Sequence, residues 1–226
     1  MTDLEGELID VGSPGASARR EFERRKAKHE ARIEQRWGTG RLGRIAKALS
    51  DDPQSTVAWA KGAVGEEKVA RVLQEQLGDC AVLLHDRKVR GTRGNIDHLV
   101  VAPSGVWIVD AKRHKGKVEK RDVGRWFKSD VRLFVGGRDR SKAVEALGWQ
   151  HDAVRAALGD GDIPVHRALS FVGAEWPLFA RPFQLDGVWI SWPKKLAELI
   201  RGGATALSED DIERVALHLS RQLPSN

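Results

Sequence analysis

The sequence predicts an α/β protein in which helices cover a mixed β-sheet. Two long segments, 54–77 and 142–158, carry apolar residues at helical spacing, whereas residues 95–112 carry runs of apolar β-forming residues on both sides of a Pro-Ser-Gly turn. Strand patterns that are close in the sequence therefore alternate with helical ones. This order is typical of a sheet with helices packed on its faces.

The N-terminal region is expected to stand apart from this core. Residues 1–18 are acidic and rich in Gly, Ser and Pro, which predicts a loose tail. Residues 19–37 predict a charged helix that docks on the domain, pairs with a second copy or lies along a phosphate backbone. A short helix is expected at 42–49. The thin apolar stripe of the charged helix consists of Phe22, Ile33 and Trp37.

The core is predicted to begin with the helix 54–77. Its buried stripe is expected to include Val57, Val64, Val69, Val72, Leu73 and Leu77. Gly62 and Gly65 are poor helix formers, so their expected use is to let the helix approach the sheet closely. A strand at 80–85 should follow and bury Cys80 as a small apolar residue.

The remaining elements alternate between strands and helices. Residues 86–94 predict a basic, glycine-rich loop before the hairpin 95–112. Further elements are strands at 117–120, 131–135, 165–173 and 187–191, helices at 142–158 and 193–200, and a last helix capped by Ser208. We divide the chain into an extension (1–53), a core (54–175) and a C-terminal appendix (176–226).

The hairpin 95–112 places charges at the end of an apolar face. A turn centred between Pro103 and Ser104 makes facing residue numbers add to 207. The expected facing pairs are Val101 with Val106, Leu99 with Ile108, and Asp97 with Asp110. Lys112 lies two residues beyond Asp110, on the same face. Because facing carboxylates repel, we expect a cation between them.

Composition and charge indicate a nucleic-acid partner. Residues 19–47 carry 11 Lys and Arg against 4 Asp and Glu, and residues 87–142 carry 16 against 6, on a chain of net charge +6. Clustered positive charge suits a polyanion, and an ordinary solvated surface is the alternative. A single cysteine and the lack of a long apolar run predict a cytoplasmic protein without a membrane segment.

The carboxylates suit a hard divalent cation such as Mg²⁺ or Mn²⁺, which prefers oxygen ligands. Such an ion polarises a phosphodiester and lowers the pKa of an attacking water. The backbone carbonyl of Ala111 could be a further ligand, and Glu66 could complete the set if its helix crosses this face. Lys112 could position the water or neutralise charge in the transition state.

Three ordered motifs carry a resemblance to a known family. These are Gly62-Ala63-Val64-Gly65-Glu66, Asn95-Ile96-Asp97-His98, and Gly105 to Lys112 followed by Gly116. They resemble the NERD (nuclease-related) domain, which is similar to the PD-(D/E)XK nuclease superfamily. The resemblance implies a restriction-endonuclease-like core of order α-β-β-β-α-β and metal-dependent phosphodiester hydrolysis.

The resemblance also implies roles for individual residues. Glu66, Asp97 and Asp110 would bind metal, Lys112 would be the catalytic lysine, and Gln150 matches a glutamine on the second helix. The sequence departs from the family pattern in three places. Asp110 stands where many members have Glu, Ile96 replaces a proline before the first Asp, and Ala146-Leu147 replace Asn-Pro before the glutamine. A capping or solvent-facing glutamine is the alternative for Gln150.

The sequence thus predicts a Mg²⁺-dependent nuclease whose expected substrate is DNA rather than RNA; a homodimer is compatible with it. An inactive nucleic-acid-binding or regulatory module of the same fold is the alternative. We call the second basic segment, residues 87–142, the basic block. Among eight tryptophans, Trp126 lies inside this block and is a candidate for stacking on a base. The residues expected to bind phosphates are Arg87, Lys88, Arg90, Arg93, Arg113, Lys115 and Lys117.

Overall fold

A computed structural model describes residues 8–37, 40, 54–92, 94–126, 128–159 and 162–226. The expected helix 42–49 and Arg93 lie outside these residues. The first described helix, α1 (Ala16–Trp37), is followed by α3 (Gln54–Leu77), which has the predicted bounds.

The main sheet has six strands in the order β1-β2-β3-β7-β9-β8. Strands β1, β2 and β3 are antiparallel, β7 and β9 continue the sheet in parallel, and β8 closes it antiparallel to β9. Their bounds are β1 (Val82–Lys88), β2 (Asn95–Ala102), β3 (Gly105–Arg113), β7 (Val165–Val172), β8 (Phe183–Leu185) and β9 (Val188–Ser191). The predicted mixed sheet is confirmed.

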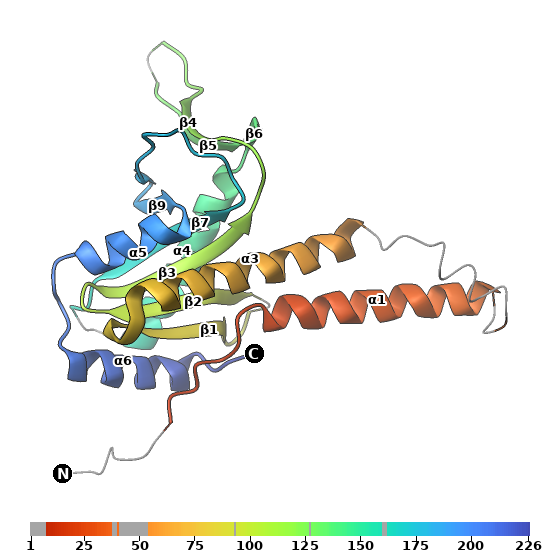
Figure 1. Cartoon of the computed structure of the whole chain (residues 1–226), viewed down its shortest axis with the longest axis horizontal. Helices are drawn as coiled ribbons and strands as arrows, with labels where there is room; N and C mark the ends of the chain where they lie inside the picture. The colour runs from red at the N-terminus through yellow and green to blue at the C-terminus, as the bar shows by residue number, and fades with distance from the viewer. Residues whose placement is uncertain (1–7, 38–39, 41–53, 93, 127, 160–161) are drawn as a thin grey trace.

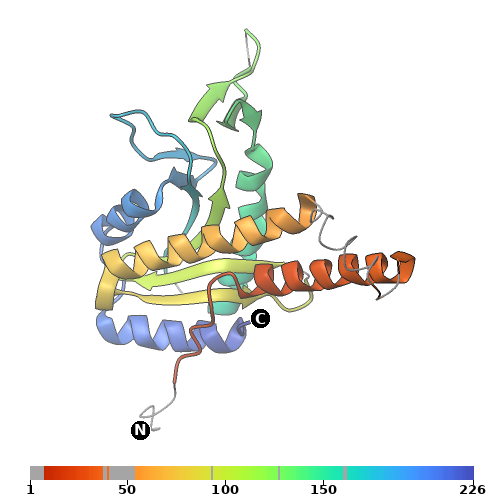
Figure 2. The same ribbon diagram turned by 45° about the vertical axis from the view of Figure 1, so that its right-hand side comes forward.

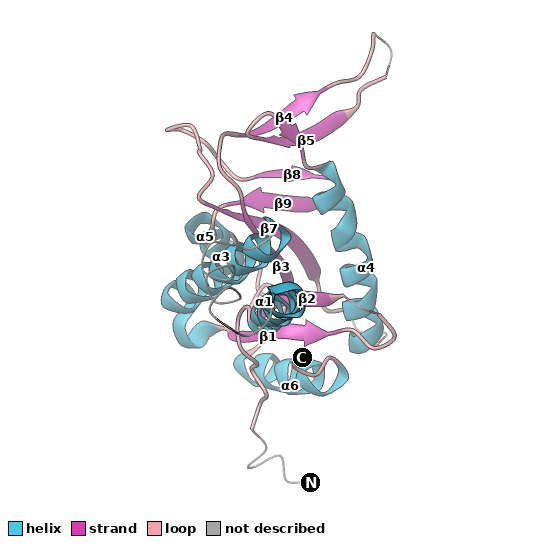
Figure 3. Ribbon diagram, turned by 90° about the vertical axis from the view of Figure 1, so that its right-hand side faces the viewer, coloured by secondary structure: helices cyan, strands magenta, loops and turns pink. Residues whose placement is uncertain are grey.

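Helices cover both faces of this sheet (Figure 3). Helices α3 and α5 (Pro193–Gly202) lie on one face, and α4 (Ser141–Leu158) and α6 (Glu209–Gln222) lie on the other. The order α3, β1, β2, β3, α4, β7 is the α-β-β-β-α-β core that the resemblance implies. A capping box at Ser208 begins α6, as predicted.

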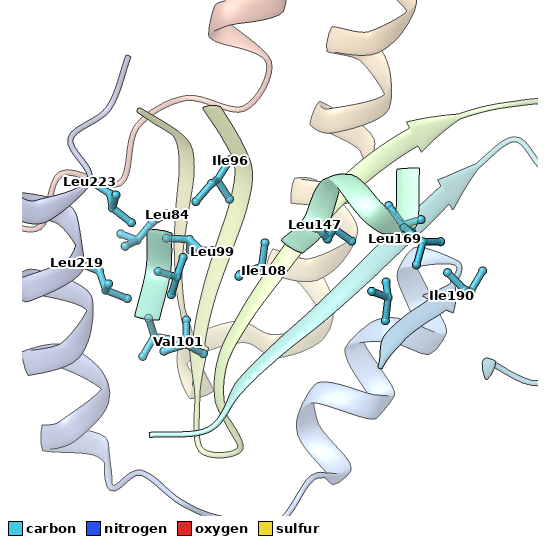
Figure 4. Packing of buried hydrophobic residues seen from close by; sticks show 14 of the residues in the cluster. Leu84, Ile96, Leu99, Val101, Ile108, Leu147, Leu169, Ile190, Leu219 and Leu223 are labelled. Carbon is cyan, nitrogen blue, oxygen red and sulfur yellow. The ribbon is translucent and has the colours of Figure 1, made fainter. Parts of the chain in front are cut away.

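The hydrophobic core is divided by the sheet into two clusters. The larger cluster lies under α4 and α6 and joins Leu99, Ile108 and Leu169 from the strands to Leu147 and Leu219 from the helices (Figure 4). The smaller one lies under α3 and α5. At about 25 cal/mol per Å² of apolar surface, this burial is the main force that holds the layers together.

The hairpin has the predicted register. Val101 pairs with Val106 and Leu99 with Ile108. The described pairing of β2 with β3 ends at His98–Val109, although β3 continues beside β7 as far as Arg113–Val172. The two strands of the hairpin therefore part before Asp97 and Asp110, and these residues lie at the resulting fork.

A second, smaller sheet projects from the end of β3 (Figure 1). It contains β4 (Val118–Asp122), β5 (Val131–Val135) and β6 (Arg138–Asp139) in antiparallel order. Strands β6 and β8 were not predicted because runs of two or three residues carry no detectable period.

The N-terminal segment packs on the core, so the prediction of a loose tail is wrong for its described residues. The backbone N–H of His85 donates to the carbonyl of Val11 over 2.8 Å, and Ile9 packs against the larger core cluster. Helix α1 then runs beside α3 (Figures 1 and 2), where Arg19 forms an ion pair with Glu67. The helix therefore docks on the domain, which is one of its three expected uses, and the other two stay predictions.

Three local predictions are wrong. Val64 is 48% exposed because its position on α3 faces away from the sheet. Cys80 is exposed because a 3₁₀ turn delays the strand until Val82. A Cβ on Gly62 would meet open space, whereas a Cβ on Gly65 would lie 3.2 Å from Cβ of Arg113, so only Gly65 permits a close approach.

Candidate active site

The site lies where β2 and β3 part. There the Asp97 carboxylate accepts a hydrogen bond of 2.9 Å from the backbone N–H of Ala111. A side chain of one strand thus binds a backbone donor of the other, beyond the last residue pair of the ladder. This bond anchors Asp97 against β3, close to Asp110.

The two predicted carboxylates are brought together. Burial raises the pKa of Asp97 well above its usual range, and the charges of Asp110 and Glu66 and a hydrogen bond with the Asp110 carboxyl raise it further. Asp110 itself is only 5% exposed. Two carboxylates this close cannot both ionise easily without a compensating charge.

Lys112 supplies one such charge. Its ammonium forms an ion pair with Asp110. Burial alone would lower the pKa of Lys112, but the carboxylates of Asp110, Asp97 and Glu66 raise it above its ordinary value. Lys112 is therefore protonated at neutral pH, with about a third of its side chain open to solvent.

Glu66 approaches from α3, next to the close contact at Gly65. Burial raises the pKa of Glu66 to about 7, and the charges of Asp86 and Asp110 contribute. Its Oε2 atom is buried without a hydrogen-bond partner among the described residues. A buried carboxylate oxygen of this kind is costly unless a proton or a cation satisfies it.

Asp86 is a further carboxylate of the site and is buried, although the sequence did not predict its position. It accepts hydrogen bonds of 2.7 Å from the backbone N–H of Ser17 and from Nδ2 of Asn95, and Arg20 lies 3.3 Å from it. Asp86 has φ of +51°, unusual for a residue in a strand. The start of α1 therefore contacts the site in two places. Ser17 donates to Asp86, and the backbone N–H of Gly15 donates to Glu66.

Two histidines lie behind the carboxylates. Nδ1 of His85 and Nδ1 of His98 are 2.9 Å apart, and both rings are buried. Burial lowers the pKa of His85 to about 4 and that of His98 well below its usual range. Both rings are neutral at pH 7, so one ring donates and the other accepts. Their burial gives both histidines a structural role.

Gln150 lies on α4 and is buried, with its Oε1 lacking a hydrogen-bond partner within the described part of the chain. The alternative of a solvent-facing glutamine is thereby contradicted. The structure shows no hydrogen bond that joins it to the described carboxylates.

The six predicted phosphate-binding residues that the structure describes fall into two groups. Lys88, Arg90, Arg113, Lys115 and Lys117 are exposed. Arg87 is fully buried in β1, so the prediction that it binds phosphate is wrong. Its guanidinium donates to the carbonyls of Leu223, Asp10 and Ser220 over 2.6, 2.8 and 2.9 Å. It ties the two ends of the described chain to the sheet.

The carboxylate oxygens of the site are suitable ligands for a divalent cation, although the described side chains are not arranged as a preformed metal site. Over the described ranges, no group of three or more His, Cys, Asp or Glu side chains is arranged to hold a metal ion. Lys112 binds Asp110 and the Ala111 N–H binds Asp97, so oxygens of both carboxylates already face protein donors. The unpartnered Oε2 of Glu66 and the raised pKa of Asp97 are the features that fit an added cation.

Comparisons with known proteins identify one family. Residues 61–172 match the family model described as nuclease-related domain, NERD. Neither the curated proteins nor the solved structures contain a match to this chain. In the part of the chain that the structure describes, none of the helices has the length and apolar character needed to cross a membrane.

Proposed function

Because residues 61–172 place the chain in the NERD family, a nuclease-related family, we propose that it is a metal-dependent nuclease that hydrolyses phosphodiester bonds. One observation carries this proposal: Asp97, Asp110 and Lys112 of the hairpin meet at the fork of the sheet and interact electrostatically with Glu66 from α3. The expected substrate is nucleic acid, DNA in preference to RNA.

The carboxylates of Glu66, Asp97 and Asp110, with the backbone carbonyl of Ala111, would hold Mg²⁺ or Mn²⁺. A bound divalent ion supplies Lewis acidity toward the phosphate and a water of lowered pKa. Glu66 and Asp97 must lose their protons to act as ligands, because metal binding requires deprotonated carboxylates. Their raised pKa values therefore couple loading of the site to pH.

Lys112 acts through its charge. The neighbouring carboxylates keep it protonated, and part of its side chain reaches solvent. An ammonium in this place neutralises negative charge that develops on the phosphate and orients the attacking water by hydrogen bonding. Asp110 holds it there before substrate arrives.

Exposed cations hold the rest of the substrate. Arg113 follows Lys112 as the last residue of β3, Lys115 lies two residues further, and Lys88 and Arg90 lie where β1 ends. Contacts of this kind bind any nucleic-acid backbone and weaken with salt.

An inactive binding module is the second candidate. The observation that favours it is the ion pair of Lys112 with Asp110, together with the lack of a three-residue metal group among the described residues. In such a module the lysine would replace the cation rather than cooperate with it.

Cleavage assays separate the two candidates. The purified protein is incubated with linear and single-stranded DNA and with RNA, in Mg²⁺, Mn²⁺ or EDTA. Asp97→Asn keeps an oxygen that can accept from Ala111 but removes the charge, and Asp152→Asn removes an exposed carboxylate of α4 as a matched control. We expect metal-dependent cleavage by the wild type and the control only.

Cleavage in EDTA, or cleavage by Asp97→Asn at the wild-type rate, would refute the proposed metal site. Binding without cleavage in every metal would favour the inactive module.

A further inference from the structure

The ribbon of β4 and β5 ends in a loop that has no part in the site described above. We call residues 123–126 and 128–130 the tip loop. The ribbon stands away from the main sheet, with the tip loop at its far end (Figures 1 and 3).

The described residues of the tip loop are held in a defined conformation. The Asp122 carboxylate accepts hydrogen bonds from the backbone N–H groups of Gly124 and Asp130, both 2.9 Å, and from the Ser129 hydroxyl, 2.6 Å. The Val123 N–H donates to the Asp130 carbonyl across the base of the loop. A Cβ on Gly124 would lie 1.9 Å from the Lys128 carbonyl oxygen, so the turn requires glycine.

This loop presents an indole to solvent. Trp126 is 97% exposed, and Val123 beside it is 43% exposed. Arg125 and Lys128 are also exposed, and neither has an ion-pair partner in the described part of the chain. Arg121 and Arg132, lower on the ribbon, are paired with Glu119 and Asp130. Unpaired positive charge is thus concentrated next to the exposed ring.

We propose that the tip loop binds single-stranded nucleic acid, with Trp126 stacked on an unpaired base and Arg125 and Lys128 on the flanking phosphates. An aromatic face between cations is how proteins bind single strands without reading their sequence. A duplex offers no open base face within its stack. An acidic protein surface would explain the cations but not an exposed indole between them.

This inference rests on the proposed function in one respect only, namely that the bound single strand is part of the nuclease substrate. Strand β3 carries Lys112 and leads directly into the ribbon. The five residues of β4 carry the tip loop about 13 Å beyond Val118, at 3.3 Å per residue. That length alone equals about four base steps of 3.4 Å, so a strand bound at the tip loop has to extend at least this far from the foot of the ribbon. A substrate that engages both sites therefore needs an unpaired arm longer than this.

The test measures binding without turnover. Fluorescence anisotropy in EDTA compares a labelled 20-nucleotide single strand with a blunt duplex of the same sequence, for the wild type, Trp126→Phe and Trp126→Leu. Phenylalanine keeps a ring that stacks, whereas leucine keeps only apolar surface. Phe179→Ala is the control, because Phe179 is 90% exposed but lies outside the basic block. Thermal melts verify that each variant is folded.

We expect Trp126→Leu to bind the single strand about tenfold more weakly and Trp126→Phe to stay within about twofold of the wild type. Binding to the duplex should not change in either variant. Equal single-strand affinity in Trp126→Leu, equal losses in both variants, or no binding by the wild type would overturn the inference. If single-strand binding depends on Trp126 but the wild type does not cleave in Mg²⁺ or Mn²⁺, the nuclease proposal is refuted and this inference stands.

Discussion

The fork between β2 and β3 and the ribbon of β4 and β5 come from the same basic stretch of the chain but use charge in opposite ways. At the fork, burial and mutual repulsion raise the pKa values of Glu66 and Asp97, and one ammonium serves several carboxylates. On the ribbon, Arg125 and Lys128 are exposed to solvent. The charge of a buried group depends on pH through its shifted pKa, which suits catalysis. The interactions of an exposed charge depend on salt concentration, which suits substrate binding.

The largest expected effect is loss of activity when the fork loses its ammonium. Lys112→Met keeps most of the side-chain volume but leaves the carboxylates of Asp110 and Asp97 without their cation. We expect cleavage to fall at least about a hundredfold, as when a transition-state donor is removed. Single-turnover cleavage at saturating protein measures this fall.

Lys142→Met is the matched control for Lys112→Met, because Lys142 is exposed on α4. Cleavage by Lys112→Met within threefold of the wild type would assign Lys112 a structural role only.

Arg87 is a cation of the same basic stretch that lies neither at the fork nor in contact with solvent. It is buried with hydrogen bonds to three backbone carbonyls, so Arg87→Met leaves those acceptors unsatisfied. We expect the free energy of unfolding to fall by about 3 kcal/mol, as for a broken buried charge network. Urea denaturation gives the value.

The salt dependence of nucleic-acid binding should be unchanged in Arg87→Met under conditions where the variant is folded. A shallower salt dependence would show that Arg87 contacts phosphate after all, against its burial in the structure.

The pKa of Glu66 predicts a pH dependence of stability. Between its ordinary value of 4.5 and the folded value of about 7, the folded protein holds the proton more tightly than the unfolded chain. The free energy of unfolding should therefore fall as pH rises through this window, by up to about 3 kcal/mol. Glu66→Gln should lessen the fall, and Asp97 accounts for part of the remainder.

Urea denaturation in EDTA at several pH values between 4.5 and 8 measures this slope. In Mn²⁺ the wild type should gain more stability at pH 8 than at pH 6, because the ligands must be deprotonated. An identical slope in Glu66→Gln would place the titrating group elsewhere.

The sequence predicted most of the fold because long elements carry their own period. Helix α3 and strand β5 have the predicted bounds, and the hairpin register followed from its turn. The errors have tertiary causes. Arg87 was assigned to a loop because its neighbours are charged, yet pairing with Ile96 and contacts with both ends of the chain extend β1 over it.

The candidate site was predictable to the extent that it lies on one hairpin. Asp97, Asp110 and Lys112 share a short segment, so register alone brings them together. Asp86 was missed because its partners, Ser17 and Arg20, come from α1, nearly 70 residues away in sequence. Such contacts leave no local pattern in the sequence.

The smallest expected effect belongs to the exposed cations at the base of the ribbon. Arg113→Ala and Lys115→Ala remove charges that are open to solvent, so the free energy of unfolding should change by less than about 0.5 kcal/mol. Each variant should lower the slope of log affinity against log salt by about one, because one phosphate contact is lost. Titrations of labelled single-stranded DNA at several salt concentrations measure this slope. A loss of affinity that does not depend on salt would mean that these residues contribute packing rather than charge, and the contrast between the fork and the exposed cations would then rest on the tip loop alone.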